Sequence, residues 1–405
     1  MPYAYDARGN MISTTNVLNQ TTTMTYDDEG RVISVTDPLN NTTQYDYVSS
    51  TCGCGGSGKL ARITDALNQQ TNYEYDAAGN MILVTDALNR STAYEYDTMN
   101  RLTAVESPAG SNKRMTFTYN QLGHLISQTD FLGRTTTMAY DYQGRITSRT
   151  DPVGTVYYTY NETGMPLSVQ DELGHTVTRS YDDGLRYVMD ALPHNRWRLY
   201  TYDSIGRLSK VEALPAGDLI EYSYSATTGL LTKTRYWSGA TYHDADYVYD
   251  GAARVARIND WLDATVGIQY AYDALGRLST LTDYSLSKQL SYTYDAAGRI
   301  ASMTDYNGHT TNYTYTARGE LASITAPGSK VWNFSYNALG QRTQYTHPNG
   351  TRTEYGYDTQ NRLTSIQHKD VSTEAVLFGL SYTLNDGGNI TRVDHNDASY
   401  WLYGY

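Results

Sequence analysis

Phenylalanine and cysteine are scarce in this sequence, and it has no long apolar run. Its 405 residues include 4 phenylalanines and 2 cysteines against 41 tyrosines, so most of its aromatic rings carry a hydroxyl group. Tyrosine suits a surface where the ring is covered and the hydroxyl meets water or a partner, whereas a sealed core favours phenylalanine and leucine. The composition therefore predicts rings on partly wetted surfaces.

Other absences exclude whole classes of function. No run of 18 apolar residues exists, so no membrane-spanning helix is expected. A formal net charge of −12 opposes binding to nucleic-acid phosphates. The opening segment MPYAYDARGN has neither the basic nor the apolar part of a signal peptide. We therefore expect no nucleic-acid partner and no membrane insertion.

A tandem repeat organises the sequence from end to end. A tyrosine that precedes a turn recurs eighteen times, and nine of the seventeen intervals are 20 or 21 residues. The widest interval holds an irregular Cys/Gly-rich insertion at 48–59. The period predicts one array of about 18 repeats over 1–405 with no internal domain boundary. The recurring tyrosines are Tyr5, Tyr26, Tyr45, Tyr75, Tyr96, Tyr119, Tyr140, Tyr160, Tyr181, Tyr202, Tyr224, Tyr249, Tyr272, Tyr294, Tyr315, Tyr336, Tyr357 and Tyr382.

Each repeat contains turn motifs in which aspartate is followed three residues later by glycine or asparagine, as in DAAG, DSIG and DALN. Aspartate at the first position of a type I turn accepts backbone N–H groups, and glycine or asparagine tolerates the left-handed conformation that follows. Such a loop closes a β-hairpin through a bulge. We expect this structural role for Asp27, Gly30, Asp76, Gly79, Asp203, Gly206, Asp273, Gly276, Asp295 and Gly298.

The segments between turns are rich in threonine, tyrosine, valine and isoleucine, which is typical of strands. The predicted fold is therefore all-β, a tandem antiparallel hairpin meander with two strands per repeat of about 21 residues. So long a sheet is expected to coil into a spiral shell or wall. Alternate tyrosines share one face and form a stripe: Tyr73, Tyr75, Tyr94, Tyr96, Tyr270, Tyr272, Tyr292, Tyr294, Tyr313 and Tyr315.

The direction of this stripe stays open at this point. The partner strands carry apolar residues three positions apart, such as Leu278 and Leu281, which breaks the alternation of a regular strand. As structure, the tyrosines pack one face of the sheet. As a surface, they could stack on sugars or hold an unfolded polypeptide.

Four segments carry a family resemblance: YEYDAAGNMI, YTYDAAGRIASMTD, YAYDALGRLSTLTD and YTYDSIGRLSKVE. They resemble the YD repeats of the bacterial rearrangement-hotspot (Rhs) family, which toxin-complex shells and extracellular teneurins share, over nearly all of 3–405. The resemblance implies a hollow β-shell around a toxin, or an adhesion scaffold, at a secreted or cell-surface location. The family's self-cleaving core and toxic domain are not found, and the motif DPVG at Asp151 occupies an ordinary turn position. We expect a truncated piece of wall whose open edges either self-associate or are protected by flanking segments outside this sequence.

Few side chains are candidates for chemistry. His243, Asp244 and Asp246 could serve a metal or acid–base site, or lie in an irregular polar loop, which we favour. Cys52 and Cys54 are too few for a zinc site, which leaves a glycine-rich excursion with a local disulfide, or pairing outside the segment. The histidines that follow turn glycines are expected to flank hairpins: His124, His175 and His309.

Three classes of function follow from these observations. We favour a non-catalytic segment of a hollow β-shell that encapsulates a toxin or effector polypeptide, with no cofactor and no metal. Its partners would be the enclosed polypeptide or flanking shell segments. The alternative is an extracellular adhesion or carbohydrate-binding scaffold, and the third class is an enzyme.

Overall fold

A computed structural model describes residues 2–49, 58–108, 113–184, 186–260 and 263–404. These ranges contain 37 β-strands and no helix, so the predicted all-β meander with two strands per repeat is confirmed. It follows that no helix long and apolar enough to cross a bilayer is found in the described ranges. Most of the insertion at 48–59, with Cys52 and Cys54, lies outside the described residues.

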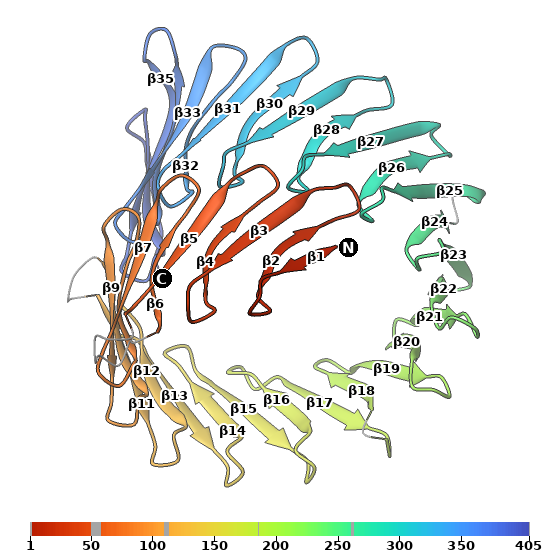
Figure 1. Ribbon diagram of the computed structural model, residues 1–405. Helices are drawn as coiled ribbons and strands as arrows, with labels where there is room; N and C mark the ends of the chain where they lie inside the picture. Colours follow the sequence, from red (N-terminus) through yellow and green to blue (C-terminus); the bar gives the residue numbers. More distant parts are fainter. Residues whose placement is uncertain (1, 50–57, 109–112, 185, 261–262, 405) are drawn as a thin grey trace. The chain divides into compact units, whose positions relative to one another are not determined.

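The strands are short and follow one another along the chain at regular spacing (Figure 1). Their bounds are β1 Tyr3–Tyr5, β2 Met11–Thr15, β3 Thr21–Tyr26, β4 Val32–Thr36, β5 Thr42–Tyr47, β6 Leu60–Thr64, β7 Gln70–Tyr75, β8 Met81–Thr85, β9 Ser91–Tyr96, β10 Leu102–Glu106, β11 Arg114–Tyr119, β12 Leu125–Thr129, β13 Thr135–Tyr140, β14 Ile146–Thr150, β15 Thr155–Tyr160, β16 Pro166–Gln170, β17 Thr176–Tyr181, β18 Tyr187–Leu192, β19 Arg196–Tyr202, β20 Leu208–Leu214, β21 Asp218–Tyr224, β22 Leu231–Ser238, β23 Thr241–Tyr249, β24 Val255–Asp260, β25 Asp263–Tyr272, β26 Leu278–Asp283, β27 Lys288–Tyr294, β28 Ile300–Thr304, β29 Thr310–Tyr315, β30 Leu321–Ala326, β31 Lys330–Tyr336, β32 Arg342–Thr346, β33 Thr351–Tyr357, β34 Leu363–Asp370, β35 Val376–Leu384, β36 Ile390–His395 and β37 Tyr400–Leu402.

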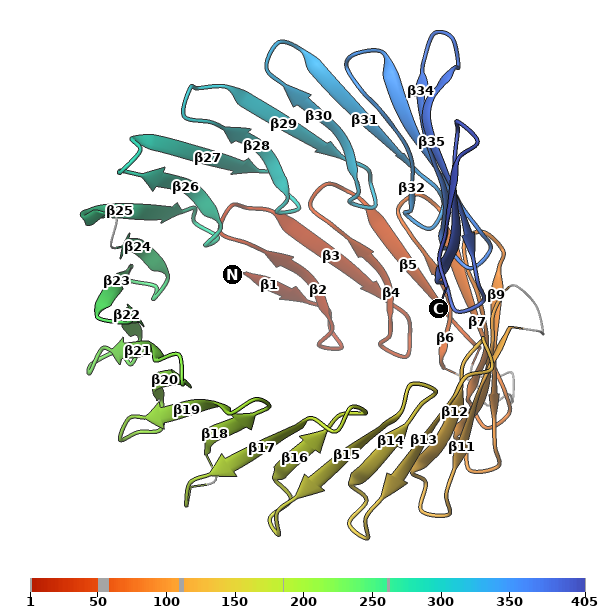
Figure 2. The ribbon, with the colours of Figure 1, turned by 180° about the vertical axis from the view of Figure 1, so that it is seen from behind.

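Two compact units divide the chain. Unit 1 comprises 1–118, 128–134 and 292–405, and unit 2 comprises 119–127 and 135–291. Within each unit a strand pairs antiparallel with the next strand in sequence, as β3 does with β4 and β22 with β23. In unit 1, β3–β5 and β29–β31 lie beside one another when viewed from the front and from behind (Figures 1 and 2). The prediction of a single array without a domain boundary stays a prediction.

The turns between strands follow the aspartate-to-glycine pattern. In the turn that begins at Asp27, the Gly30 N–H donates to the Asp27 carbonyl at 3.1 Å and the Asp27 N–H donates to the Arg31 carbonyl at 3.0 Å. Gly30 has φ of +78°, and Asn68, in the same position of another turn, has φ of +61°. This positive φ is why the position holds glycine or asparagine.

A β-bulge after the turns that follow tyrosine-ended strands explains the apolar residues three positions apart. Tyr272 lies opposite Leu278 and Tyr270 lies opposite Leu281, with the register shifting by one residue between them. The extra residue in the bulge brings both leucines to the tyrosine face. The same shift places Met81 opposite Tyr75. The spacing that broke the expected alternation is therefore the signature of the bulge.

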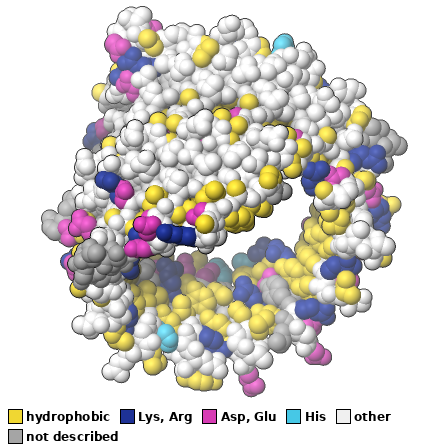
Figure 3. Space-filling view, in the orientation of Figure 1, with side chains coloured by type: hydrophobic (Ala, Val, Ile, Leu, Met, Phe, Trp, Pro, Cys, Tyr) yellow, Lys and Arg dark blue, Asp and Glu magenta, His cyan; other side chains and the backbone are white. Residues whose placement is uncertain are grey.

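The two faces of the sheet differ in character, and neither is sealed. In unit 1, Thr23 and Thr25 of β3 are exposed. Met24, which lies between them, and Tyr26, which follows them, are half-buried. On the visible face of β2–β5, uncharged polar side chains and backbone predominate (Figure 3). Among the described residues, the buried hydrophobic side chains are Ala104 and Val393. The wall is one sheet thick, and its tyrosine-rich face takes the place of a core.

Candidate functional site

The repeat is held together by an aspartate, an arginine and a tyrosine. In one fully developed example, the Asp27 carboxylate accepts the Arg31 N–H at 2.9 Å and the Arg31 Nε at 2.7 Å. The guanidinium carbon of Arg31 lies 4.5 Å from the ring centre of Tyr47, in the next repeat. The Tyr47 hydroxyl donates to the Val32 carbonyl at 2.8 Å. We call this arrangement the repeat lock, because it joins each turn to the following hairpin.

The tyrosine part of the repeat lock recurs along the array with little change in geometry. The donating tyrosine ends a strand, and the acceptor is the backbone carbonyl of the first residue after the previous repeat's turn, usually 15 residues earlier. Bonds of this kind join Tyr26 to Met11, Tyr75 to Leu60, Tyr96 to Met81, Tyr140 to Leu125, Tyr160 to Ile146, Tyr181 to Pro166, Tyr224 to Leu208, Tyr249 to Leu231, Tyr272 to Val255, Tyr315 to Ile300, Tyr336 to Leu321 and Tyr357 to Arg342.

The turn residues chosen from the sequence lie in this arrangement. The carboxylate of Asp203 accepts the Ile205 N–H and both the N–H and Nε of Arg207. Asp273 and Asp295 bind Arg277 and Arg299 in the same way. At Asp76 the residue after glycine is Asn80, whose amide replaces the guanidinium. The glycines all have positive φ: Gly30, Gly79, Gly206, Gly276 and Gly298.

The tyrosine stripe divides into two positions with different roles. The second tyrosine of each pair donates a hydroxyl to the previous hairpin, as Tyr75, Tyr96, Tyr272 and Tyr315 do. The first tyrosine packs across the strand pair instead: Tyr73 lies opposite Val84. Tyr94, Tyr270 and Tyr313 lie opposite Val105, Leu281 and Ile324. Tyr292 and Tyr294 belong to β27.

Electrostatics keep the turn carboxylates charged and the tyrosines neutral. The side-chain amide of Asn80 is the largest cause that lowers the pKa of Asp76, and the backbone N–H of Asn80 lowers the pKa further. Burial alone would raise the pKa of Asp27, but the hydrogen bonds from Arg31 outweigh it and the pKa falls. Burial raises the pKa of Tyr75 and Tyr96. The aspartates are thus permanent anions at neutral pH, suited to hold turns and unsuited to act as acids.

Removing one hydroxyl group tests the repeat lock. We expect Tyr47→Phe to lower the free energy of unfolding by about 1 kcal/mol, because the hydrogen bond to the Val32 carbonyl is lost while the ring stays. Urea unfolding followed by circular dichroism measures the change. The repeat count from the sequence was wrong at Tyr45, because Tyr47 ends β5 and Tyr45 holds the first position. Tyr45→Phe removes the hydroxyl of this first-position tyrosine, and it should change stability little. Equal losses in the two variants would contradict the role assigned to the repeat lock.

A second set of contacts joins segments far apart in the sequence within unit 1. Arg318 Nη1 donates to the Asp65 carboxylate at 3.1 Å, and Gln360 Nε2 donates to Ser107 Oγ at 3.0 Å, in each case across 253 residues. Arg90 donates to the Asp358 carbonyl at 3.2 Å and also to the Asn361 side chain. We call this line of turn-to-turn contacts the seam.

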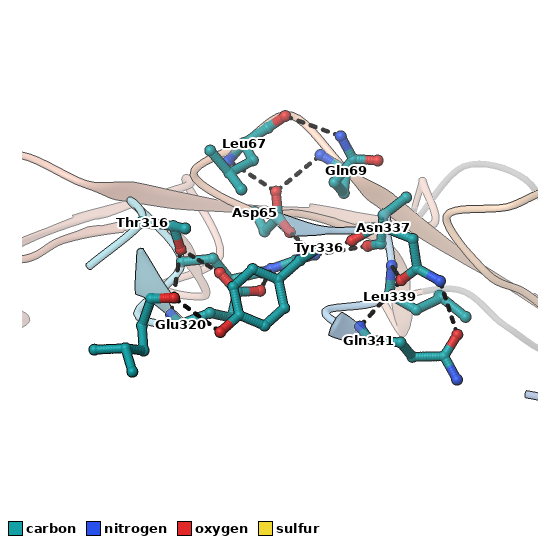
Figure 4. A network of polar contacts seen from close by, with 12 residues as sticks. Asp65, Leu67, Gln69, Thr316, Glu320, Tyr336, Asn337, Leu339 and Gln341 are labelled. Carbon is teal, nitrogen blue, oxygen red and sulfur yellow. Dashed lines mark hydrogen bonds and ion pairs between the residues drawn. The ribbon is translucent and has the colours of Figure 1, made fainter. Parts of the chain in front are cut away.

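The close-up in Figure 4 shows how the two sides of the seam meet. The turn that carries Asp65, Leu67 and Gln69 lies against the turns that carry Thr316, Glu320, Tyr336 and Asn337. The side chains of Arg318 and Asp65 are about one-fifth exposed, at 20% and 21%. Arg318 also donates to the Asn337 and Ala338 carbonyls of its own side, so its guanidinium is fixed before it meets Asp65. Lys113 and Asp386 form a further ion pair across the seam.

The strongest acid–base candidate from the sequence does not form such a site. The expectation of an irregular polar loop is wrong, because His243, Asp244 and Asp246 lie in the regular strand β23. Alternation turns His243 to the face opposite to the two aspartates. Arg235 binds the Asp244 carboxylate through two hydrogen bonds of 2.7 and 2.9 Å, and together with Lys233 it lowers the pKa of Asp244 to about 2. A carboxyl group with this pKa is not a general acid near neutral pH.

The histidines that follow turn glycines lie beside turn carboxylates or pack on a tyrosine. His175 Nδ1 lies 3.1 Å from the Asp171 carboxylate and His309 Nδ1 lies 3.3 Å from that of Asp305, where arginine binds in other repeats. His124 takes the same position and packs on Tyr140, with ring centres 4.8 Å apart. In the described ranges, no group of three His, Cys, Asp or Glu side chains could hold a metal ion.

Sequence reasoning missed two sets of functional residues. The arginine after the turn glycine is visible in the repeats GRV, GRI and GRL, and its recurrence beside a tyrosine-rich strand could have indicated the stacking in the repeat lock. The seam residues Asp65, Arg90, Arg318 and Gln360 belong to ordinary repeats. No local signal marks them, because the contact depends on which repeats the fold brings together.

Comparison with known proteins places the chain in a family. It matches the Teneurin YD-shell family over residues 56–256, 246–368 and 288–405, and the RHS Repeat family over 5–42 and 26–47. The chain therefore belongs to the Teneurin YD-shell family, and its residues 5–47 match the RHS repeat. A search of curated proteins found no match.

Solved structures of TcdB2-TccC3 are similar in fold. The structure of TcdB2-TccC3-TEV is 12% identical over 97% of this chain and 32% of its own, with a TM-score of 0.58. The structure of TcdB2-TccC3 is 14% identical over 97% of this chain and 30% of its own, with a TM-score of 0.56. The structure of TcdB2-TccC3-Cdc42 is 16% identical over 97% of this chain and 22% of its own, with a TM-score of 0.54. This chain thus spans a third or less of the length of these structures, and at such identities the likeness concerns the fold alone.

Proposed function

We propose that this chain is a non-catalytic wall segment of a hollow β-shell that encloses a toxin or effector polypeptide. The observation that carries the proposal is the seam. Within unit 1, turns 253 to 271 residues apart bind one another through side chains and backbone carbonyls. A sheet that is fastened to itself in this way is a barrier, which an open strip of hairpins is not. Membership of the YD-shell family supports the same function.

The tyrosine face has the chemistry of a lining for an unfolded polypeptide. Burial raises the pKa of Tyr47, Tyr75 and Tyr224, so these rings are neutral at physiological pH. The second-position hydroxyls are already bonded to backbone carbonyls. A face of neutral rings contacts apolar and polar segments alike without selecting one sequence. We propose that this face contacts the enclosed chain, and that the assembly acts outside the producing bacterial cell.

Protease protection tests the proposed function. The complete gene product, expressed with its neighbouring open reading frames, is treated with a protease, and polypeptide fragments associated with the wall are identified by mass spectrometry. We expect a protected polypeptide in the native protein and its digestion after the seam is opened by Arg318→Glu. The exposed pair of Arg62 and Asp46 provides a matched control, since Arg62→Glu should leave protection unchanged. Digestion at the same rate with the seam closed and opened would exclude encapsulation.

A further inference from the structure

The repeat formed by β21, β22 and β23 in unit 2 is longer than the usual 20 or 21 residues. Its bounding tyrosines, Tyr224 and Tyr249, are 25 residues apart, and β22 and β23 have 8 and 9 residues where the equivalent strands β4 and β5 have 5 and 6. The extra residues extend both strands to a closing pair of Ser238 and Thr241. Trp237 and Tyr242 lie opposite each other on this extension.

The face opposite to the tyrosine stripe is unusual in this repeat. Arg235 pairs across the sheet with Glu221 on one side and Asp244 on the other. In regular repeats the position equivalent to Arg235 holds threonine, such as Thr36 and Thr64. Thr36 bonds only to another threonine hydroxyl across the next strand pair, at 2.8 Å. The charged and aromatic side chains are therefore not needed to build the sheet.

These side chains fix one another in place. Trp237 Nε1 donates to the Glu221 carboxylate at 2.8 Å, and the ring centres of Trp237 and Tyr242 are 4.9 Å apart. The guanidinium carbon of Arg235 lies 4.1 Å from the ring centre of Tyr242. Tyr242 is nevertheless 51% exposed. A rigid aromatic surface with its polar groups already oriented loses little entropy when a ligand binds.

We propose that Trp237 and Tyr242, with Arg235 and Glu221, form a binding site for an uncharged hexopyranose of an oligosaccharide, and that Asp246, four residues along β23 from Tyr242, contacts the adjoining sugar. The C–H face of a pyranose ring packs on aromatic rings, and its hydroxyls exchange hydrogen bonds with carboxylate and guanidinium groups at the rim. Lys233 and Arg235 are two cations against three carboxylates, Glu221, Asp244 and Asp246, so the site has one net negative charge and disfavours acidic sugars.

The density of charge favours a sugar over a protein partner. The core of a protein–protein interface is depleted of charged residues, whereas here charged side chains surround the two rings at contact distance. The carboxylate of Asp246 is 47% exposed and lies 3.3 Å from Lys233, which leaves lone pairs to accept hydrogen bonds from a hydroxylated ligand. This inference stands independently of the proposed encapsulation.

Glycan binding by the full chain tests the site. The wild-type protein is applied to an array of neutral hexose and N-acetylhexosamine oligosaccharides together with sialylated and sulfated ones, and the best ligand is titrated by calorimetry. We expect a neutral saccharide to bind, and Trp237→Ala to weaken it by at least about tenfold. Tyr236→Ala is the matched control, because Tyr236 is adjacent in β22, is 42% exposed and faces the other side.

A second variant keeps the test valid if the loss of Trp237 harms folding. Asp246→Asn removes a charge and keeps the size of the side chain, so it should weaken binding while the thermal unfolding curve stays unchanged. Binding of sialylated or sulfated glycans in preference to neutral ones would overturn the proposal. So would an array with no bound neutral saccharide, or an equal loss of affinity in Tyr236→Ala.

Discussion

Acidification below pH 4 is expected to unfold the array cooperatively. Many of the aspartates that begin turns have pKa values below the ordinary 3.8, because hydrogen bonds from their own turns outweigh the effect of partial burial. Their depressed pKa means that the unfolded chain binds more protons than the folded chain in the acid range. The stabilisation is present in full above the unfolded value and is lost as the pH falls through the folded values.

The size of this effect comes from repetition. Each turn contributes a small term, and the same shift recurs at many turns of one sheet, so the losses add over distant sites. Lowered pKa values of this kind are found at Asp6, Asp27, Asp37, Asp76, Asp97, Asp130, Asp141, Asp171, Asp182, Asp203, Asp250, Asp273, Asp305 and Asp358.

Urea unfolding at pH 7, 5, 4, 3 and 2.5, followed by circular dichroism, measures the prediction. The midpoint should change little between pH 7 and 5 and then fall steeply below pH 4. Protonation also leaves 31 Lys and Arg side chains unopposed, and their mutual repulsion could unfold the chain by itself. Adding 0.5 M NaCl as a control screens this repulsion but does not restore the turn hydrogen bonds. A midpoint that recovers fully in salt would contradict the role given to the aspartates.

Reversing one charge at the seam is expected to open it. Arg318→Glu places a carboxylate beside Asp65, in a site where both side chains are about one-fifth exposed. We expect a local loss of about 2 kcal/mol, or roughly thirty-fold faster amide hydrogen exchange at the turns that meet there. Hydrogen exchange read by mass spectrometry separates this local opening from global unfolding.

A second substitution makes the seam experiment specific. Asparagine begins other turns of this chain, such as those at Asn120 and Asn337, so Asp65→Asn should preserve its own turn. Combined with Arg318→Glu, it removes the repulsion between positions 65 and 318, and exchange should slow again. It should not return fully to the wild-type rate, because Glu320 still faces the new carboxylate. If exchange in the double variant stays as fast as in Arg318→Glu alone, the contact with Asp65 is not what holds the seam.

The sequence was sufficient for the parts of the fold that depend on neighbours in the chain. Turn chemistry at Asp76 and Gly79, and strand composition between turns, predict the hairpins because both are local effects. The bulge could have been predicted, because Leu278 and Leu281 lie three positions apart on one face. The expectation of strict alternation along the strand prevented this interpretation. The stretch around Asp244 was assigned to a loop because its length departs from the period, although lengthened strands accommodate the extra residues equally well.

The seam contacts, which carry the proposed function, could not be predicted from the sequence for a physical reason. Arg318 and Asp65 are 253 residues apart, and the turns that carry them meet within unit 1. A small change in the twist of each strand pair would shift that meeting by a whole repeat. The partner of a given turn is thus set by the accumulated geometry of the array and not by any motif near it.

The repeat lock has a consequence for how such a chain can evolve. In each hydrogen bond of this kind described above the acceptor is a backbone carbonyl, and the residues that supply it include Met11, Val32, Pro166 and Arg342. A tyrosine therefore requires nothing of the side chain in the preceding repeat. Recombination that duplicates or deletes a repeat places two repeats side by side that were not neighbours before. The tyrosine of one can still donate its hydroxyl to a backbone carbonyl of the other. Walls of different length are accessible in single genetic steps.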